Sequence, residues 1–215
     1  MAIRFSVLFF LAVFVAACSD SGKEKSVITT STDGVTFGNE YFGLAVTKPD
    51  GWYSQAPEDT MKLNSKGASL MAGDNQNMKA IIDDALKSSL PLFAFFQFEP
   101  GTPGKLNANI ISVAENIEVL PGIKSGCDYL SHARTLLENA AMKVNVAEGC
   151  KTRTVNNAQL GYLDISMNLQ GITVLQRLYS CVNKQHALSF TQTYFDDAGR
   201  AAVEEIVDSI HVDCE

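Results

Sequence analysis

The sequence predicts an α+β domain, namely an α/β/α sandwich around a mainly antiparallel β-sheet. Alternating apolar residues mark its strands, and apolar residues three and four positions apart mark its amphipathic helices. Along the chain the order is strands, a helix, two strands, a helix, four strands and a last helix. Helices that cover both faces of such a sheet give three layers. A chain of 215 residues suits one domain behind a short tether.

The first part of the domain shows short strands and turns. Residues 35–37 and 41–47 alternate in apolar character and predict two strands. The Pro-Asp-Gly sequence at 49–51 predicts a turn before the next extended segment. Pro57 opens a short helix, because proline and the acidic residues that follow it suit a first helical turn. The pattern assigns no element to 64–73.

A long helix and a strongly apolar strand come next. Asp74 is a good N-cap for a helix over 75–88, where apolar residues recur at helical spacing. Residues 92–98 are apolar on both alternating faces, which predicts a central strand that is covered on both sides. If its outer face were uncovered, that strand would form a groove for an apolar ligand. The following strand runs from Leu106 to about Ile117.

The second half contains a capped helix and a run of four strands. Ser125 and Asp128 form a capping box that starts the helix. Asparagine-containing turns at 156–157 and 183–184 predict hairpins. The predicted strands span 144–154, 159–169, 172–182 and 186–194.

The last helix begins at Asp196 or Asp197, either of which suits an N-cap. Its apolar residues recur at helical spacing and predict a stripe that packs on the sheet. The members of this stripe are Val203, Ile206, Val207 and Ile210.

An export signal precedes the domain. Arg4 is followed by an almost unbroken apolar run over 5–14 and then by small residues, as in a secretory signal peptide. The run is shorter than the roughly 20 apolar residues that a membrane-spanning helix needs. Its end, Val-Ala-Ala-Cys at 15–18, resembles the lipobox of bacterial lipoprotein precursors. That resemblance implies cleavage before Cys18 and lipidation of Cys18; an ordinary signal and a coincidental cysteine are the alternatives.

These features divide the chain into a lipoprotein signal peptide at 1–17, a lipidated flexible tether at 18–34 and a single globular domain at 35–215. The tether is polar and has too little apolar surface to fold. Ser19 stands where an aspartate commonly retains lipoproteins in the inner membrane, which favours the outer membrane, although Asp20 keeps the inner membrane open. We therefore expect a lipid-anchored protein on the periplasmic face of a bacterial cell envelope.

Four further cysteines predict disulfides, because an even number in an exported chain is typical of structural bridges. The second long helix climbs about 25 Å, and the extended chain after it returns about as far. This geometry brings Cys150 back to Cys127. The last strand and the last helix bring Cys214 near Cys181 in the same way. We favour these two pairings, and a Cys150–Cys181 bridge is the main rival.

Composition and motif spacing narrow the possible functions. A formal net charge of −7 argues against a nucleic acid partner. No zinc-site spacing, Gly-x-Ser-x-Gly motif or phosphate-binding loop occurs in the sequence. Acidic pairs at 83–84, 196–197 and 204–205 fit helix caps and solvated faces. We expect no catalytic site, cofactor or metal, including at the three histidines, His132, His186 and His211.

Residues 42–52, Phe-Gly-Leu-Ala-Val-Thr-Lys-Pro-Asp-Gly-Trp, resemble the opening of the PsbP/Mog1/DcrB-like superfamily. Domains of that superfamily begin with an aromatic–x–hydrophobic strand that runs into Pro-x-Gly-Trp. The later order of elements is also similar, so the resemblance spans about 35–212. It implies an α/β/α sandwich and a mostly non-catalytic role, among photosystem subunits, a GTPase-binding protein and envelope lipoproteins. It transfers no functional residue, and the four cysteines lie outside its pattern.

The function that we expect is a non-enzymatic binding or assembly module of the cell envelope, anchored to the membrane and working with an envelope protein partner. A carrier of a small ligand or metal ion is the second hypothesis, and it needs an open pocket near the aromatic strand. A hydrolase is the third, and it needs a histidine beside a nucleophile in a cleft.

The lipobox leads to a direct test. We expect Cys18→Ser to leave an unlipidated precursor, because the serine oxygen cannot form the thioether to diacylglycerol. Mass spectrometry of the variant chain and fractionation of membranes would check this. A variant with the mass and the membrane attachment of the wild type would show that Cys18 is not the anchor.

Overall fold

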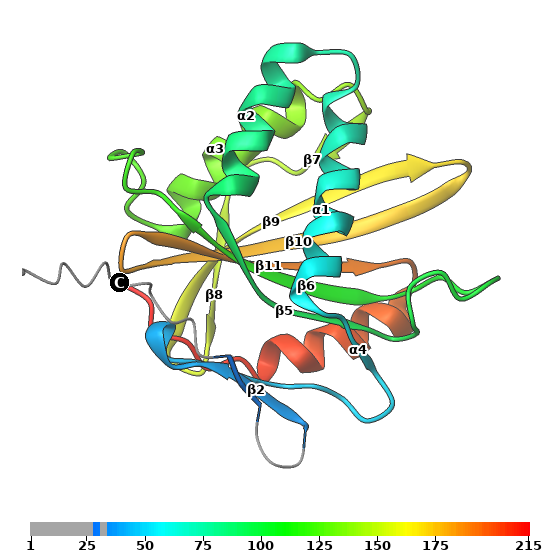
Figure 1. Ribbon diagram of the computed structural model, residues 1–215, viewed down its shortest axis with the longest axis vertical. Coiled ribbons are helices and arrows are strands. Elements are labelled where there is room, and N and C mark those ends of the chain that lie inside the picture. Colours follow the sequence, from blue (N-terminus) through cyan, green and yellow to red (C-terminus); the bar gives the residue numbers. More distant parts are fainter. Residues whose placement is uncertain (1–27, 31–33) are drawn as a thin grey trace, which may run out of the picture.

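We describe a computed structural model of the protein, which covers residues 28–30 and 34–215 (Figure 1). Cys18 and the signal peptide lie outside the described residues. Within the described part, eight strands form one sheet in the order β4-β5-β6-β11-β10-β9-β7, with β8 also paired to β9, and all neighbours run antiparallel. The strands are β4 (Tyr53–Ser54), β5 (Ser89–Phe96), β6 (Asn109–Asn116), β7 (Val144–Val146), β8 (Lys151–Val155), β9 (Ala158–Leu169), β10 (Ile172–Asn183) and β11 (His186–Tyr194).

A smaller antiparallel sheet, in the order β1-β2-β3, packs on one face of the large one. Its strands are β1 (Ile28–Thr30), β2 (Thr36–Asn39) and β3 (Leu44–Thr47). β1 lies in the segment that composition assigns to the tether. Its backbone pairs with β2, and strand pairing of this kind does not require an apolar core of its own. Residues 41–42, expected within a strand, instead belong to a 3₁₀ turn, η1 (Glu40–Phe42).

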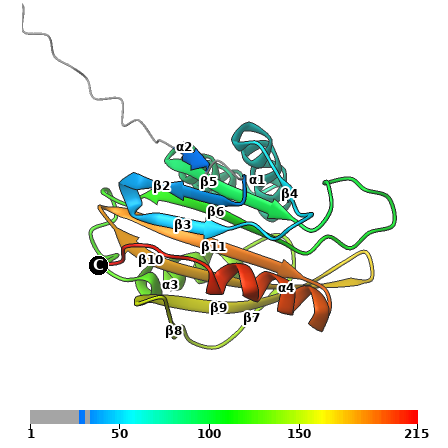
Figure 2. The same cartoon turned by 90° about the horizontal axis from the view of Figure 1, so that it is seen from below.

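The helices complete a three-layer sandwich, which confirms the predicted fold class (Figure 1). One face of the large sheet carries α1 (Pro57–Ala72), α2 (Gln76–Lys87) and α3 (Gly126–Glu138). The other face carries α4 (Asp197–Asp208) and the small sheet, which Figure 2 shows from below. Among the described residues, no helix combines the length and the apolar character needed to cross a bilayer.

The main core lies between α4, the small sheet and the large sheet. Val203, Ile206 and Val207 of α4 are almost completely buried there, as the helical spacing predicts. Ile206 and Val207 pack with aromatic residues of the large sheet such as Phe95 and Phe190, and Val203 packs with Ala108 and Tyr194. Burying a large apolar side chain of this kind contributes about 1.5–3 kcal/mol. This layer therefore supplies much of the stability of the domain.

The capping residues mostly match the sequence. The Ser125 hydroxyl accepts a hydrogen bond from the Asp128 amide at 3.2 Å, and Asp196 accepts one from the Gly199 amide at 2.7 Å. The prediction for α2 is wrong by one residue. Asn75, not Asp74, is its N-cap, because the Asn75 carboxamide accepts from the Met78 amide at 3.1 Å.

Three other elements differ from the prediction. The aromatic strand β5 is not central, since only the two-residue β4 lies outside it, yet the small sheet and α1 cover its two faces. The single strand expected over 144–154 is two strands, β7 and β8, which pair with different parts of β9. The helix that begins at Pro57 is 16 residues long and includes most of the unassigned segment.

Two disulfides join the cysteines in the pairing that the sequence favours. Cys127 is bonded to Cys150 with their Cα atoms 5.6 Å apart, and Cys181 to Cys214 with 5.8 Å between them. The first links the start of α3 to the segment before β8. The second links β10 to the chain after α4. Each closes a loop of more than 20 residues, which stabilises a fold by about 3–4 kcal/mol in the chain-entropy picture.

The start of α3 rests directly on the sheet, and glycine makes this approach possible. A Cβ atom on Gly126 would lie 1.9 Å from the carbonyl oxygen of Ser180. We expect Gly126→Ala to push α3 off β10 and to lower the free energy of unfolding by about 1–3 kcal/mol, as overpacking does. Urea unfolding would measure the change. Gly122→Ala is the control, because a Cβ there meets nothing within 4 Å, and an equal loss in both variants would contradict the explanation.

Candidate functional site

The helix-bearing face of the large sheet is not sealed, and the gap is a groove under α1. The groove has a volume of about 710 Å³ and lies between α1, the tip of α2 and strands β5, β6, β11, β10 and β9. Pockets that bind small molecules usually measure about 300–1,000 Å³. The groove is therefore large enough for a ligand, and it borders the aromatic strand through Phe96.

Helix α1 leaves the groove open along its middle, because it is fully buried only near its two ends. Thr60 in its first turn and Ala72 at its last residue are each 1% exposed, whereas no residue between them is fully buried. The Met71 carbonyl accepts a hydrogen bond from the Ala141 amide at 2.8 Å, which ties the C-terminal end of α1 to the loop after α3. The middle of α1 therefore crosses the sheet without packing tightly on it.

The sequence of α1 explains the loose packing. An amphipathic helix normally presents large apolar residues to a sheet at positions three and four apart. On the groove side α1 instead has the small residues Gly67 and Ala68 and the polar Asn64. Its two leucines on this side stay accessible, Leu63 at 37% and Leu70 at 67%. A Cβ on Gly67 would meet nothing within 4 Å, so open space lies beside it.

The floor and the far wall of the groove are mainly apolar. Ile111 and Val113 of β6 lie on the floor, and the hairpin of β9 and β10 forms the far wall. Near the tip of this hairpin Leu169 and Ile172 are 38% and 44% exposed. When a ligand covers such half-exposed apolar side chains, each Å² of apolar surface removed from water favours binding by about 25 cal/mol.

A few polar groups interrupt the apolar floor. The Gln176 amide donates a hydrogen bond to the Thr193 hydroxyl at 3.0 Å, and Asn109 and Thr191 lie on the same face. Lys66 of α1 is the charged residue among those that line the groove, and its charge is positive. The groove can thus hold an apolar body and still offer polar contacts at fixed points.

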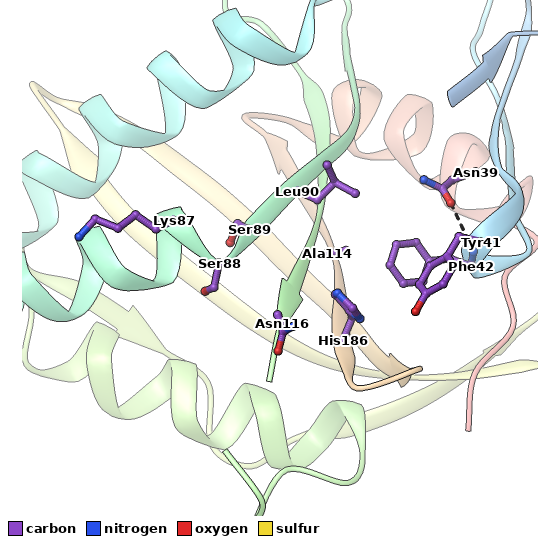
Figure 3. A pocket seen from close by; sticks show the side chains of 10 residues that line it. All are labelled: Asn39, Tyr41, Phe42, Lys87, Ser88, Ser89, Leu90, Ala114, Asn116 and His186. Carbon is purple, nitrogen blue, oxygen red and sulfur yellow. Dashed lines mark hydrogen bonds between the residues drawn. The ribbon is translucent and has the colours of Figure 1, made fainter. Parts of the chain in front are cut away.

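A second pocket, of about 440 Å³, lies between η1 and the junction of α2 with β5 (Figure 3). The Asn39 carboxamide oxygen accepts from the Phe42 amide at 3.3 Å, the bond drawn dashed in Figure 3. His186 stands near Asn116, and its ring packs edge-on against Phe42 with the centroids 5.2 Å apart. This pocket mixes polar and aromatic side chains and contains one of the three histidines.

The hydroxyl groups of the two serines of this pocket do not form a nucleophile–base pair with the histidine. Those of Ser88 and Ser89 both donate to the carbonyl of Ala85, at 3.0 and 2.7 Å. The Nδ1 atom of His186 lies 2.7 Å from the carbonyl of Lys184. A hydrolase site needs the hydroxyl and the imidazole within reach of each other. The observed bonds direct them to separate backbone groups.

A third hollow, of about 420 Å³, lies between α2 and α3 and contains His132. Beside it the Tyr129 hydroxyl donates to the Glu115 carboxylate at 2.6 Å. Burial raises the pKa of Glu115 above its ordinary value, and burial together with the Glu115 charge raises the pKa of Tyr129. Both shifts follow from a carboxyl and a phenol that are partly removed from water.

The histidines lie on different elements, with His132 in α3, His186 at the start of β11 and His211 after α4. The His211 Nδ1 atom lies 3.1 Å from the Ser209 carbonyl. Over residues 34–215, no three His, Cys, Asp or Glu side chains are grouped as a metal ion would require. The structure therefore joins the four cysteines in two pairs but does not bring the histidines together.

The groove itself is what sequence reasoning did not locate. The sequence tied an apolar groove to an uncovered face of β5, but the opening lies beside that strand, over β6, β11 and β10. The available signal was the unusual face of α1, where Leu63, Gly67 and Leu70 occupy one stripe at helical spacing with little bulk between the leucines. Without a prediction of a helix over 64–73, that stripe could not be recognised.

Comparisons with known proteins identify no family, since no family model and no curated protein match the chain. Similar solved structures include cyanobacterial PsbP from Synechocystis sp. PCC 6803, at 12% identity and a TM-score of 0.49, over 83% of this chain and 91% of that one. LpqN, involved in cell envelope biogenesis of Mycobacterium tuberculosis, matches at 12% identity and 0.41, over 78% and 82%.

A protein from Bacteroides thetaiotaomicron matches at 12% identity and a TM-score of 0.42, over 80% of this chain but only 46% of its own. The chain thus spans less than half the length of that protein. Likenesses of this size carry no information about function. Membership of the superfamily that residues 42–52 resemble stays a prediction.

The partly buried Glu115 gives the stability a pH dependence. Because its pKa is raised in the folded state, the folded protein holds the proton more tightly than the unfolded chain. The resulting stabilisation is present below the ordinary value of 4.5 and is lost as the pH rises through the raised value. Glu115→Gln removes this titration and keeps an oxygen that can accept from Tyr129.

We therefore expect the variant to gain stability relative to the wild type as the pH rises from about 4 to 8. Urea unfolding at a series of pH values would measure it. Glu118→Gln on the exposed segment after β6 is the control. If both variants kept the pH profile of the wild type, Glu115 would not be the titrating group.

Proposed function

We propose that this chain is a non-catalytic binding module of the bacterial cell envelope, held to the membrane through Cys18, and that the groove under α1 is its binding site for an apolar ligand. The observation that carries the proposal is the groove itself. It combines an opening of about 710 Å³ with a mainly apolar lining of half-exposed leucine and isoleucine side chains. Concave sites of this kind are the usual position of ligands.

The location in the envelope rests on the sequence. The signal peptide, the lipobox and the two disulfides all suit an exported chain. A chain anchored at Cys18 would keep the groove close to a membrane, where apolar ligands are concentrated. The periplasmic face of the outer membrane is the position that Ser19 favours.

The expected envelope protein partner is a second candidate for binding at the opening of the groove. Leu63, Leu70, Leu169 and Ile172 surround the opening, and exposed apolar side chains that gather in this way often mark interaction sites. A partner could therefore receive or deliver the ligand at this opening. In-cell crosslinking of the lipidated chain, followed by mass spectrometry, would identify it.

The proposal predicts that filling the groove abolishes binding. Gly67→Phe adds a ring at an α1 position that lines the groove and has no atom within 4 Å of a Cβ, and phenylalanine is also a better helix former than glycine. We expect the full chain with Cys18→Ser to bind the uncharged fluorescent probe N-phenylnaphthylamine. The additional Gly67→Phe change should weaken binding at least about tenfold, or about 1.4 kcal/mol.

Ser65→Phe is the matched control. It adds the same side chain to α1 at an exposed position that does not line the groove. Fluorescence titration of the three proteins would measure the affinities, and urea unfolding would check that each is folded. Equal binding by the Gly67 variant and the control would show that the groove is not the site.

A further inference from the structure

We propose that the ligand of the groove is an amphiphile with an acyl chain and an anionic head group, and that Lys66 binds the head. This inference rests on the proposed function, because it specifies the chemistry of the same site. It follows from two properties of the lining, namely its charge and the hydrogen bonds that its strands already make.

Lys66 is the charged side chain of the groove. Every other described residue that lines the groove is apolar or uncharged. Lys62 of α1 pairs with Asp59 at 2.7 Å and Lys87 of α2 pairs with Asp84 at 3.0 Å, whereas Lys79 of α2 lies outside the lining. Within the described residues, no carboxylate lies within 4.0 Å of the Lys66 ammonium group.

An unpaired cation next to an apolar groove favours a ligand of matching charge. The chain as a whole has a formal charge of −7, so positive charge at this opening is not a general property of the surface. An anionic head would find its counter-ion at Lys66 while its chain lay along the apolar floor. A cationic amphiphile would meet repulsion from the same ammonium group.

The hydrogen bonds of the floor favour an acyl chain over a peptide. Strands β6, β11 and β10 each have a paired strand on both sides, so their backbone groups are already bonded. A peptide in the groove would bring N–H and C=O groups that need partners of their own. Among the polar side chains there, the Gln176 amide already donates to Thr193. An acyl chain makes no such demand.

The test compares ligands that share one chain and differ in the head. Dodecanoate and dodecanol would displace N-phenylnaphthylamine from the full chain with Cys18→Ser, below the micelle concentration of dodecanoate and the solubility limit of dodecanol. We expect dodecanoate to bind more tightly by about two- to fivefold, the range of an exposed ion pair. The preference should weaken with added salt, since exposed charges are screened.

Variants of Lys66, with one of Lys62 as a control, show which residue causes the preference for dodecanoate over dodecanol. Lys66→Gln should remove the difference between dodecanoate and dodecanol, and Lys66→Glu should reverse it. Lys62→Gln, one turn earlier on the same helix and outside the lining, should keep it. The binding of dodecanol, which has no charge, should stay within about twofold in all of these proteins.

Two results would overturn the inference. Equal displacement by dodecanoate and dodecanol from a chain that binds the probe would show that the head group is not recognised, and the proposed function would still stand. A preference that survives in Lys66→Gln would show that another residue binds the head. Absence of probe binding would instead contradict the proposed function itself.

Discussion

The packing of α4 on the large sheet is the interaction on which the rest of the structure depends. Its apolar stripe is buried against the sheet, and Glu204 on the same helix binds both Arg153 of β8 and Arg177 of β10. The chain after α4 then pairs with β3 through Ala45 and His211 and ends in the disulfide from Cys214. One helix and its C-terminal extension thus hold the small sheet and the large sheet together.

This arrangement lets the opposite face stay partly open. A sheet buried on one face by a well-packed core can leave apolar side chains of the other face half exposed, because folding does not depend on them. Helix α3 is tied to the sheet by Gly126 and by the Cys127–Cys150 bridge, and α1 is buried mainly at Thr60 and Ala72. Between its two buried ends, α1 lines the groove with half-buried and exposed residues.

The sequence predicts best what is determined locally. The stripe of α4 and the cap at Ser125 follow from spacing within one helix, and both agree with the structure. The cysteine pairing also follows, because a helix and the strand beside it return the chain over a predictable distance. By contrast, the place of β5 near the sheet edge depends on which strands become its neighbours, and alternation within one strand does not specify them.

The groove escaped prediction for a related reason. An open groove exists where the helix that covers a sheet lacks bulky side chains. It can therefore be recognised only when that helix has been identified. Residues 64–73 looked irregular because Asn64, Gly67 and Ala68 interrupt the apolar spacing that marks a packed helix. The same interruption is what leaves room under α1. A weak helical pattern that nonetheless forms a 16-residue helix is therefore informative about the site.

Gly67 makes this point most directly. Glycine inside a helix costs about 1 kcal/mol relative to alanine, and nothing within 4 Å of its Cβ position would prevent a larger residue. The helical conformation of Gly67 does not need glycine either, in contrast to Gly43, whose φ of 59° lies in the left-handed region. Neither sterics nor backbone geometry explains glycine here. The remaining physical consequence is a wider groove beside Lys66, which is what an acyl chain lying under α1 would require.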